Sequence, residues 1–160
     1  MITVVKYKTG LSIPQEYNEI NGCLYWYKLV NQIYINEERN LMIYNYVSTL
    51  QDKKILLIVT RSSMISEPLS KLSSDKILLA SNKFEPNDDK YNDIDHVVYM
   101  IPSSQVKIPP KCNKITMFVD NNPVLVNLCR RSIKFIADDK LITISTVSNN
   151  TNIAIKDYPG

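Results

Sequence analysis

Glycine is almost absent from this chain, which has three glycines in 160 residues: Gly10, Gly22 and Gly160. None lies between Cys23 and Pro159. Loops that cradle phosphate groups need glycine, because the backbone must adopt positive φ and approach the anion closely. Walker loops, dinucleotide-binding fingerprints, kinase glycine loops and serine nucleophile elbows each need more than one. The sequence therefore excludes these sites, and we expect no nucleotide cofactor.

Length and composition indicate one folded domain that spans residues 1–160. Hydrophobic residues make up 44% of the chain, which is enough to build a core. The net charge of +3 says little about partners by itself. Isoleucine, asparagine, lysine and tyrosine are used heavily while glycine is scarce. Codons for the favoured residues are AT-rich, which is typical of a viral or parasitic genome, and we take a viral protein as the working hypothesis.

The cysteines and the hydropathy pattern bear on where the protein resides. Cys23, Cys112 and Cys129 are widely spaced and form no CxxC or CxxH pair. An odd number of cysteines without such spacing favours free thiols in a reducing compartment. Residues 1–8 lack the apolar core of a signal peptide, and no stretch reaches the ~20 apolar residues of a membrane span. We therefore expect an intracellular protein, in the cytoplasm or a host cytoplasm, with no membrane partner.

The hydrophobic pattern switches repeatedly between strand and helix periods from Gln32 to Ile136. This alternation predicts an α/β layered domain with a mostly parallel central sheet. Residues 54–60 and 76–80 are apolar at successive positions, which is typical of strands covered on both faces. We expect both runs in the interior of the sheet, with further strands at 96–101 and 115–119.

Two helices are predicted from asparagine caps. Asn36 precedes two glutamates and a stripe of apolar residues at helical spacing. Asn122 precedes a proline, which is favoured at the first position of a helix. A shorter helix is expected after Ser62, although Pro68 limits its regularity.

The two ends of the chain are rich in β-formers. We predict strands at 2–7, 23–30 and 32–35 near the N-terminus, because these runs are aromatic and β-branched. Residues 141–147 and 153–155 are predicted strands at the C-terminal end. We expect these segments to extend the central sheet with antiparallel additions.

The order of elements from Val30 to Ser104 resembles the second RecA-like lobe of superfamily 2 helicases. In that family a strand precedes a helix that begins near a charged stretch, as residues 32–35 precede residues 37–39 here. Residues 78–81 are similar to the family's LLAT string, and residues 94–102 to its VDHVI…P string. The family's RGxD segment and its glycine–arginine motif are absent. The resemblance implies a degenerate lobe that kept the sheet and lost ATP chemistry.

His96 is the only histidine of the chain, and it follows Asp93 and Asp95 closely. A histidine that is oriented by a carboxylate can act as a general base, so these three residues are the candidates for an enzyme without a motif. We favour an inert, hydrogen-bonded histidine, because no pattern ties a serine or cysteine nucleophile to it. The acidic segment 85–95 lacks the ligand spacing and central glycine of a calcium loop, so we expect no metal site.

Six basic residues lie between Gln105 and Lys134, against the single acidic residue Asp120. Gathered on one face, they would neutralise phosphates and form a nucleic-acid-binding surface. Alternatively, the last three complement the end of a helix and face water. The six candidates are Lys107, Lys111, Lys114, Arg130, Arg131 and Lys134.

These exclusions favour a non-catalytic α/β module that binds a macromolecule, with a protein as the expected partner and nucleic acid as a second one. The setting we expect is a viral transcription, replication or host-interaction complex. Two alternatives stay open. One is a structural or scaffold subunit that self-assembles, and the other is a motif-free enzyme that uses Asp93, Asp95 and His96. The sequence does not set the oligomeric state or identify the partner.

Overall fold

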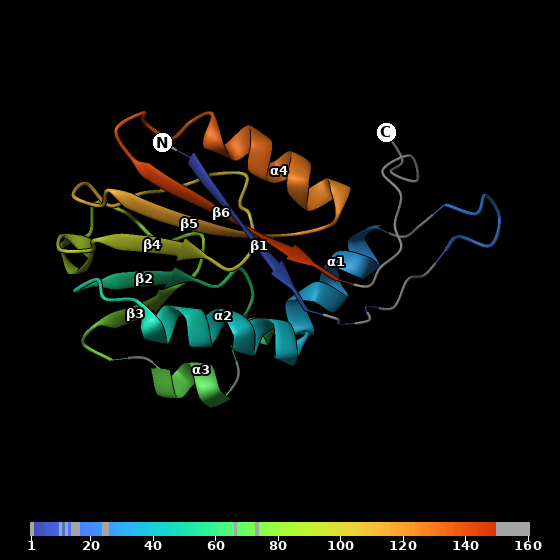
Figure 1. The fold of residues 1–160 in the computed structure, drawn as a ribbon, viewed down its shortest axis with the longest axis horizontal. Coiled ribbons are helices and arrows are strands. Elements are labelled where there is room, and N and C mark those ends of the chain that lie inside the picture. The colour runs from blue at the N-terminus through green and yellow to red at the C-terminus, as the bar shows by residue number, and fades with distance from the viewer. Residues whose placement is uncertain are drawn as a thin grey trace.

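The computed structural model describes residues 2–9, 11, 13, 17–23, 26–65, 67–72 and 74–149, without the side chains of Trp26 and Pro68. A six-stranded sheet is flanked by helices (Figure 1), so the predicted α/β class is confirmed. The strands are β1 (Ile2–Lys8), β2 (Ile55–Ile58), β3 (Ile77–Ala80), β4 (His96–Tyr99), β5 (Lys114–Asp120) and β6 (Leu141–Ser148). The helices are α1 (Trp26–Ile35), α2 (Glu37–Thr49), α3 (Glu67–Leu72) and α4 (Pro123–Ile133), with 3₁₀ turns η1 (Ser62–Met64) and η2 (Asp89–Tyr91).

Every strand pair in the described sheet is parallel, and the strand order is β1-β6-β5-β4-β2-β3. The first and last strands pair with each other, with Ile2 opposite Ile142 and Lys8 opposite Ser148. The predicted antiparallel addition is therefore wrong for both of these strands. Between successive strands a helix or a long loop returns the chain to the same edge of the sheet, which makes a parallel pairing the outcome. The strand predicted at 153–155 lies outside the described residues.

The two apolar runs of the sequence occupy different places in the sheet. β2 lies between β3 and β4 and is buried at all four positions, so its predicted interior location is confirmed. β3 is the last strand of the sheet, and Ile77 is its only buried residue, so its predicted interior location is wrong. An apolar run indicates that both faces of a strand are covered. It does not indicate whether both edges of the strand pair with other strands.

The segment before Asn36 is helical, although its composition predicts strands at 23–30 and 32–35. It forms α1, in which Leu29 and Ile33 lie one turn apart and are each 1% exposed. Their spacing is helical, and packing against η1 and α2 overrides the β propensity of the neighbouring aromatic residues. The strand that the helicase resemblance places at 32–35 is thus part of a helix, whereas β2, β3 and β4 are present as strands.

Both predicted helix caps are confirmed. The side chain of Asn36 accepts a hydrogen bond from the backbone N–H of Arg39 at 2.9 Å, and α2 begins at Glu37. The side chain of Asn122 accepts one from the backbone N–H of Val124 at 2.8 Å, with Pro123 at the first helical position. These bonds satisfy backbone donors that have no partner inside the helix.

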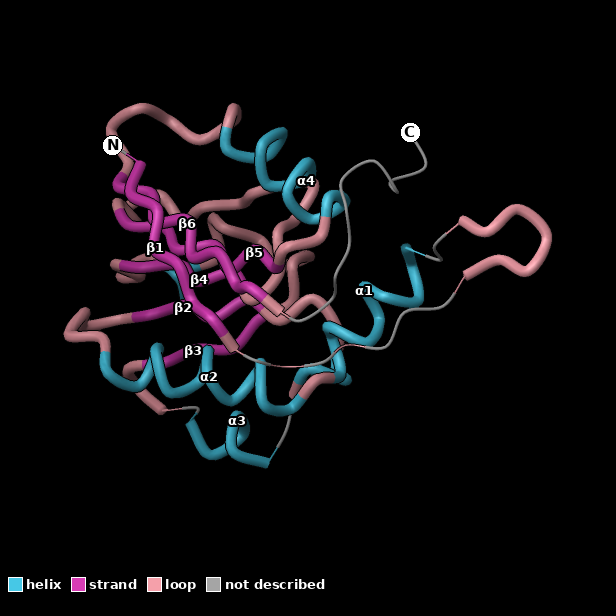
Figure 2. Tube along the Cα trace, turned by 45° about the vertical axis from the view of Figure 1, so that its right-hand side comes forward, coloured by secondary structure: helices cyan, strands magenta, loops and turns pink. Residues whose placement is uncertain are grey.

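The helices cover the two faces of the sheet unequally (Figures 1 and 2). On one face, α2 runs back from the carboxyl ends of the strands toward their amino ends, and α3 packs against it. Tyr46 of α2 lies edge-on to Phe118 of β5, with the ring centroids 5.3 Å apart. On the other face, α4 packs on β5 and buries Leu125 and Cys129. The edge strand β1 is exposed at six of its seven positions.

Truncation of a buried leucine should destabilise the protein much more than truncation of an exposed one. Leu57 is fully buried in β2, so we expect Leu57→Ala to lower the free energy of unfolding by about 2–5 kcal/mol. Leu41 of α2 is 44% exposed, and Leu41→Ala serves as the matched control, with an expected change within about 0.5 kcal/mol. Urea unfolding of both variants measures the difference. Equal losses in the two variants would contradict the described packing.

Candidate functional site

The carboxyl edge of the sheet is the first place to look for a site. The chain leaves β2 toward β3 on one side and leaves β4 toward β5 on the other. The topological switch point therefore lies between the carboxyl ends of β2 and β4. Ligands of open parallel sheets bind in the crevice at this point.

Helix α1 occupies this edge and packs against η1, which follows β2. Arg61 donates a hydrogen bond from Nη1 to Oδ1 of Asn31 at 2.5 Å, and its guanidinium lies 4.6 Å from the ring centroid of Tyr34. Leu29 and Ile33 complete the buried side of the helix. Helix α1 thus occupies part of this edge, and a hollow of about 270 Å³ remains at the carboxyl ends of β2 and β3.

A buried ion pair lies beside α1, where β4, β5 and β6 end. Arg39 and Asp120 are both fully buried, and Nη2 of Arg39 lies 2.5 Å from Oδ1 of Asp120. The same nitrogen donates to the carbonyl oxygen of Met100 at 2.6 Å. Nδ2 of Asn149 donates to the other carboxylate oxygen at 2.8 Å. Internal donors therefore occupy both oxygens of Asp120, and neither is available to a substrate as a general base.

The N-terminus of α4, at the same edge, is closed to anions. Oδ1 of Asn122 accepts from the backbone N–H groups of Val124 and Leu125, at 2.8 and 3.4 Å. Pro123 has no N–H to offer. The amides that a phosphate would need are therefore absent or already bonded, and we still expect no nucleotide to bind here.

His96 lies at the opposite, amino edge of the sheet, at the start of β4. Its Nδ1 is 3.0 Å from Oδ2 of Asp52, and its Nε2 is 2.7 Å from Oγ1 of Thr116. Lys114 donates to the other oxygen of Asp52 at 2.8 Å. These bonds join the turn before β2 to β4 and β5. The sequence-based hypothesis of His96 with Asp93 and Asp95 missed Asp52, which is 44 residues away along the chain.

The two aspartates of that hypothesis bond elsewhere. Oδ2 of Asp95 accepts from the backbone N–H groups of Lys53 and Lys54, at 3.0 and 3.2 Å. Asp93 lies 3.9 Å from Nζ of Lys54. Both carboxylates therefore hold the turn that leads into β2, and neither one orients His96.

The chain Asp52–His96–Thr116 has the order of a carboxylate, a base and a hydroxyl, as in hydrolases. Thr116, however, is only 1% exposed and lies in the middle of β5, with its hydroxyl 3.4 Å from that of Tyr46. Its backbone pairs with the neighbouring strands, so no free N–H groups form an oxyanion hole. The arrangement holds strands together and does not support acyl transfer.

The charges around His96 set the pKa values of this cluster. Burial lowers the pKa of His96 below its ordinary value of 6.5, although Asp52 opposes this effect. Burial alone would raise the pKa of Asp52, but hydrogen bonds from Lys114 and His96 outweigh it and lower that pKa. The folded protein therefore favours a neutral imidazole and an ionised carboxylate.

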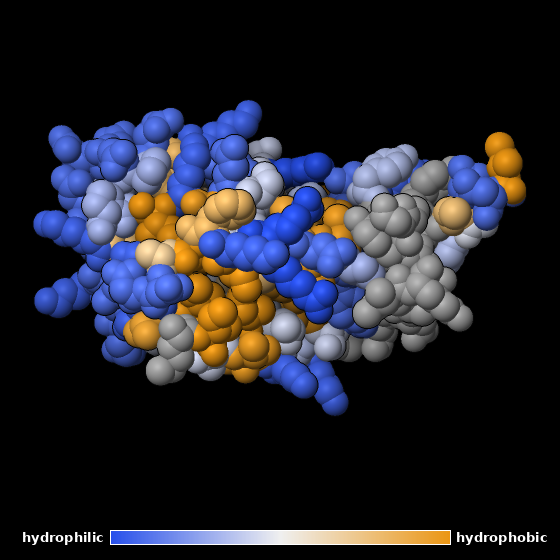
Figure 3. Space-filling view, turned by 90° about the horizontal axis from the view of Figure 1, so that it is seen from above, coloured by the Kyte–Doolittle hydropathy of each residue, from blue (hydrophilic) through white to orange (hydrophobic). Residues whose placement is uncertain are grey.

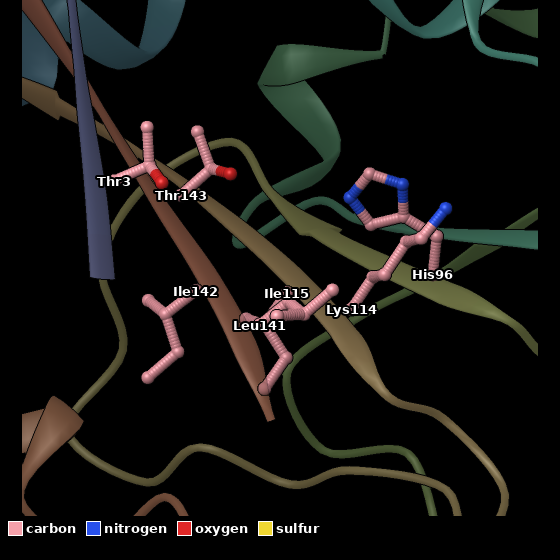
Figure 4. Close-up of a pocket in the computed structure, with 7 residues that line it drawn as sticks. All are labelled: Thr3, His96, Lys114, Ile115, Leu141, Ile142 and Thr143. Carbon is pink, nitrogen blue, oxygen red and sulfur yellow. The ribbon is translucent and has the colours of Figure 1, made fainter. Parts of the chain in front are cut away.

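A hollow of about 270 Å³ opens beside His96 and reaches β1 (Figure 4). Thr3 of β1 and Thr143 of β6 lie on one side of it, and His96 and Lys114 lie on the other. The remaining wall consists of Ile115, Leu141 and Ile142. No group of three or more metal-binding side chains occurs anywhere in the described residues.

The structure spreads the six basic candidates over different surroundings. Lys107 donates from Nζ to the carbonyl oxygen of Phe84 at 3.3 Å, and Lys114 is bonded to Asp52. Lys111 borders a second hollow, of about 440 Å³, together with two lysines and two aspartates. Arg130, Arg131 and Lys134 are exposed at the end of α4. Lys107 and Lys114 are thus bonded to other parts of the chain, and nucleic-acid binding by the six residues stays a prediction.

The most open part of the sheet is β1. Ile2, Val4 and Val5 are 53%, 57% and 37% exposed, although all three are apolar. Figure 3 looks onto the side of the sheet that carries α4 and shows hydrophobic side chains gathered at the surface of this side. Parallel sheets are normally covered by helices on both faces, so exposed apolar residues on an outer strand mark an uncovered surface. Nothing in the sequence pattern distinguishes this strand from a covered one.

Removing only one partner of the buried ion pair should strongly lower the free energy of unfolding. We expect Arg39→Met to lower the free energy of unfolding by about 3–5 kcal/mol, because it leaves the carboxylate of Asp120 buried without its cation. The double variant Arg39→Met/Asp120→Leu should recover much of that loss, since it removes both charges. A double-mutant cycle from urea unfolding measures the coupling. Additive losses would contradict the pairing.

Acid should destabilise the protein through His96. Its pKa is lower in the folded state, so the unfolded chain binds the proton first. The free energy of unfolding should therefore be highest above about pH 6.5 and decrease as the pH falls below that value. Asp52, whose pKa is also lowered, adds a further loss only near and below its ordinary value of 3.8. Urea unfolding between about pH 7.5 and pH 5 measures the first effect, and His96→Gln should flatten it. A stability that rises toward pH 5 in the unmodified protein would contradict this assignment.

Comparisons of the chain with models of protein families, with curated proteins and with solved structures found no match in any of the three. No helix in the described part of the chain is long and apolar enough to cross a bilayer. The helicase resemblance and a viral origin accordingly remain hypotheses. What the protein does has to be inferred from its own residues, among which those of β1 form the most exposed strand of the sheet.

Proposed function

We propose that the protein is a non-catalytic α/β module that binds another protein along the edge strand β1. The observation that carries the proposal is the exposure of β1, where Ile2 and Val4 are more than half exposed at the end of an entirely parallel sheet. An exposed strand edge offers a row of unpaired backbone groups and is a template for a strand of another chain. A viral complex for transcription, replication or host interaction is the setting we favour.

The bonds of the buried polar side chains support the non-catalytic part of the proposal. Asp120 is neutralised by Arg39, and α1 packs against η1 at the switch point. His96 is bonded at both ring nitrogens. Asp120 and His96, the two titratable side chains best placed for chemistry, are therefore both engaged in structural bonds.

The directions of the backbone groups in β1 identify a substitution that alters only its outer edge. The backbone N–H of Thr9 donates to the carbonyl oxygen of Ser148 in β6 at 3.1 Å. In a parallel pair, alternate residues direct both backbone groups to the same neighbour, so Thr3, Val5 and Tyr7 also face β6. The N–H groups of Val4, Lys6 and Lys8 then point away from the sheet. Val4→Pro removes an outward donor and leaves the pairing with β6 intact.

A library of random heptapeptides displayed on phage tests the proposed function. We expect selection on the unmodified protein to enrich peptides that lose binding to Val4→Pro, because proline removes an outward N–H and its ring blocks the edge. Val4→Ala is the matched control, since it shortens the side chain and keeps the N–H, and it should keep binding. Thermal unfolding must show that both variants fold. No enrichment, or peptides that bind Val4→Pro equally well, would overturn the proposal. An oligomer of the unmodified protein that Val4→Pro dissociates would show that a second copy occupies the edge, and would also overturn it.

A further inference from the structure

Four residues of β1 share two properties. The even-numbered positions direct their backbone groups away from β6, and their side chains lie on one face of the sheet, because side chains alternate along a strand. The first two are apolar and the last two are basic. These residues are Ile2, Val4, Lys6 and Lys8.

The two lysines of this face are exposed. In the described part of the chain, no carboxylate forms an ion pair with Lys6 or Lys8. Both lysines are exposed, and their neighbours in β6 are the uncharged residues Thr146 and Ser148. The apolar half of the face is equally open, with Val4 57% exposed. The face therefore presents an apolar half followed by a positively charged half.

A second copy of the chain does not match this pattern. A two-fold antiparallel pairing of β1 with itself, centred on Val5, places Lys6 opposite Val4 and Lys8 opposite Ile2. Moving the centre by one residue either brings Lys6 opposite itself or places it opposite Ile2. In each register the lysines meet no carboxylate. Charge complementarity instead favours a different chain that carries acidic residues.

We propose that the partner is an extended acidic–apolar segment that adds to β1 as a seventh, antiparallel strand. The proposal rests on the proposed function of β1. The segment carries acidic residues first and apolar residues second, so that its carboxylates lie opposite Lys8 and Lys6 and its apolar side chains lie opposite Val4 and Ile2. Antiparallel pairing is slightly more stable per residue than parallel pairing, which sets the direction. Backbone hydrogen bonds supply affinity, and alternate side chains supply specificity.

Titration of the ¹⁵N-labelled protein with synthetic peptides, followed by NMR, tests this inference. The acidic-first peptide is Glu-Thr-Glu-Thr-Val-Thr-Ile, the charge-swapped peptide has lysine in place of glutamate, and the reversed peptide is Ile-Thr-Val-Thr-Glu-Thr-Glu. We expect the acidic-first peptide to shift and protect the outward amides of Val4, Lys6 and Lys8 more than the inward amides of Val5 and Tyr7. Its dissociation constant should be about tenfold lower than that of the charge-swapped peptide, since two cross-strand pairs change from attraction to repulsion.

The variant Lys6→Glu/Lys8→Glu provides the matched control, because both residues are exposed and the change leaves the ladder to β6 intact. It should reverse the preference and bind the charge-swapped peptide more tightly. Equal binding of the two peptides by the unmodified protein, or tighter binding of the reversed peptide, would overturn the inference. The proposed function would survive that result if Val4→Pro still abolished binding of every peptide. Peptides that leave the β1 amides unchanged, together with display binders that ignore Val4→Pro, would overturn both.

Discussion

The ion pair of Arg39 and Asp120 holds a helix against the ends of three strands, and the rest of the fold depends on this junction. It joins α2 to the end of β5, and its further bonds to Met100 and Asn149 reach the ends of β4 and β6. Both charges are removed from water, so the pair is stable only while every remaining donor and acceptor has a partner. The position of α2, and with it the cover over one face of the sheet, follows from this requirement.

The same ion pair explains why the carboxylate of Asp120 is not available to a ligand. A carboxylate at the end of a central parallel strand is well placed to meet a ligand, but Asp120 is committed to Arg39 inside the protein. At the opposite edge, His96 is committed to Asp52 and Thr116 in a similar way. These polar groups of the interior therefore hold strands and helices together.

Local signals in the sequence predicted the local parts of the fold. The caps at Asn36 and Asn122 and the buried strand β2 depend on residues close together in the chain, and all three were predicted correctly. Helix α1 was missed because its aromatic residues favour strands, while its buried spacing of Leu29 and Ile33 is helical. The edge position of β3 and the parallel pairing of β1 depend on strand order, which hydrophobicity does not encode.

The polar clusters were beyond sequence reasoning for the same reason. Arg39 and Asp120 are 81 residues apart, and His96 is 44 residues from Asp52. No sequence motif predicts either pair, because each pair forms only when the chain returns to the same edge of the sheet. Sequence reasoning about the site therefore rested on residues that are close together in the chain, and its most informative result was the lack of glycine loops.

The pairing of β1 with β6 has a consequence for how the protein is made. The two strands lie next to each other, yet the bond between Thr9 and Ser148 spans 139 residues of chain. On the ribosome, β1 emerges first and must wait for nearly the whole domain before its partner strand exists. Contacts of such long range slow folding and leave apolar segments open to mispairing. The nascent chain thus exposes both edges of β1 throughout synthesis, and a chaperone or an early-binding partner would find its target there before the sheet is complete.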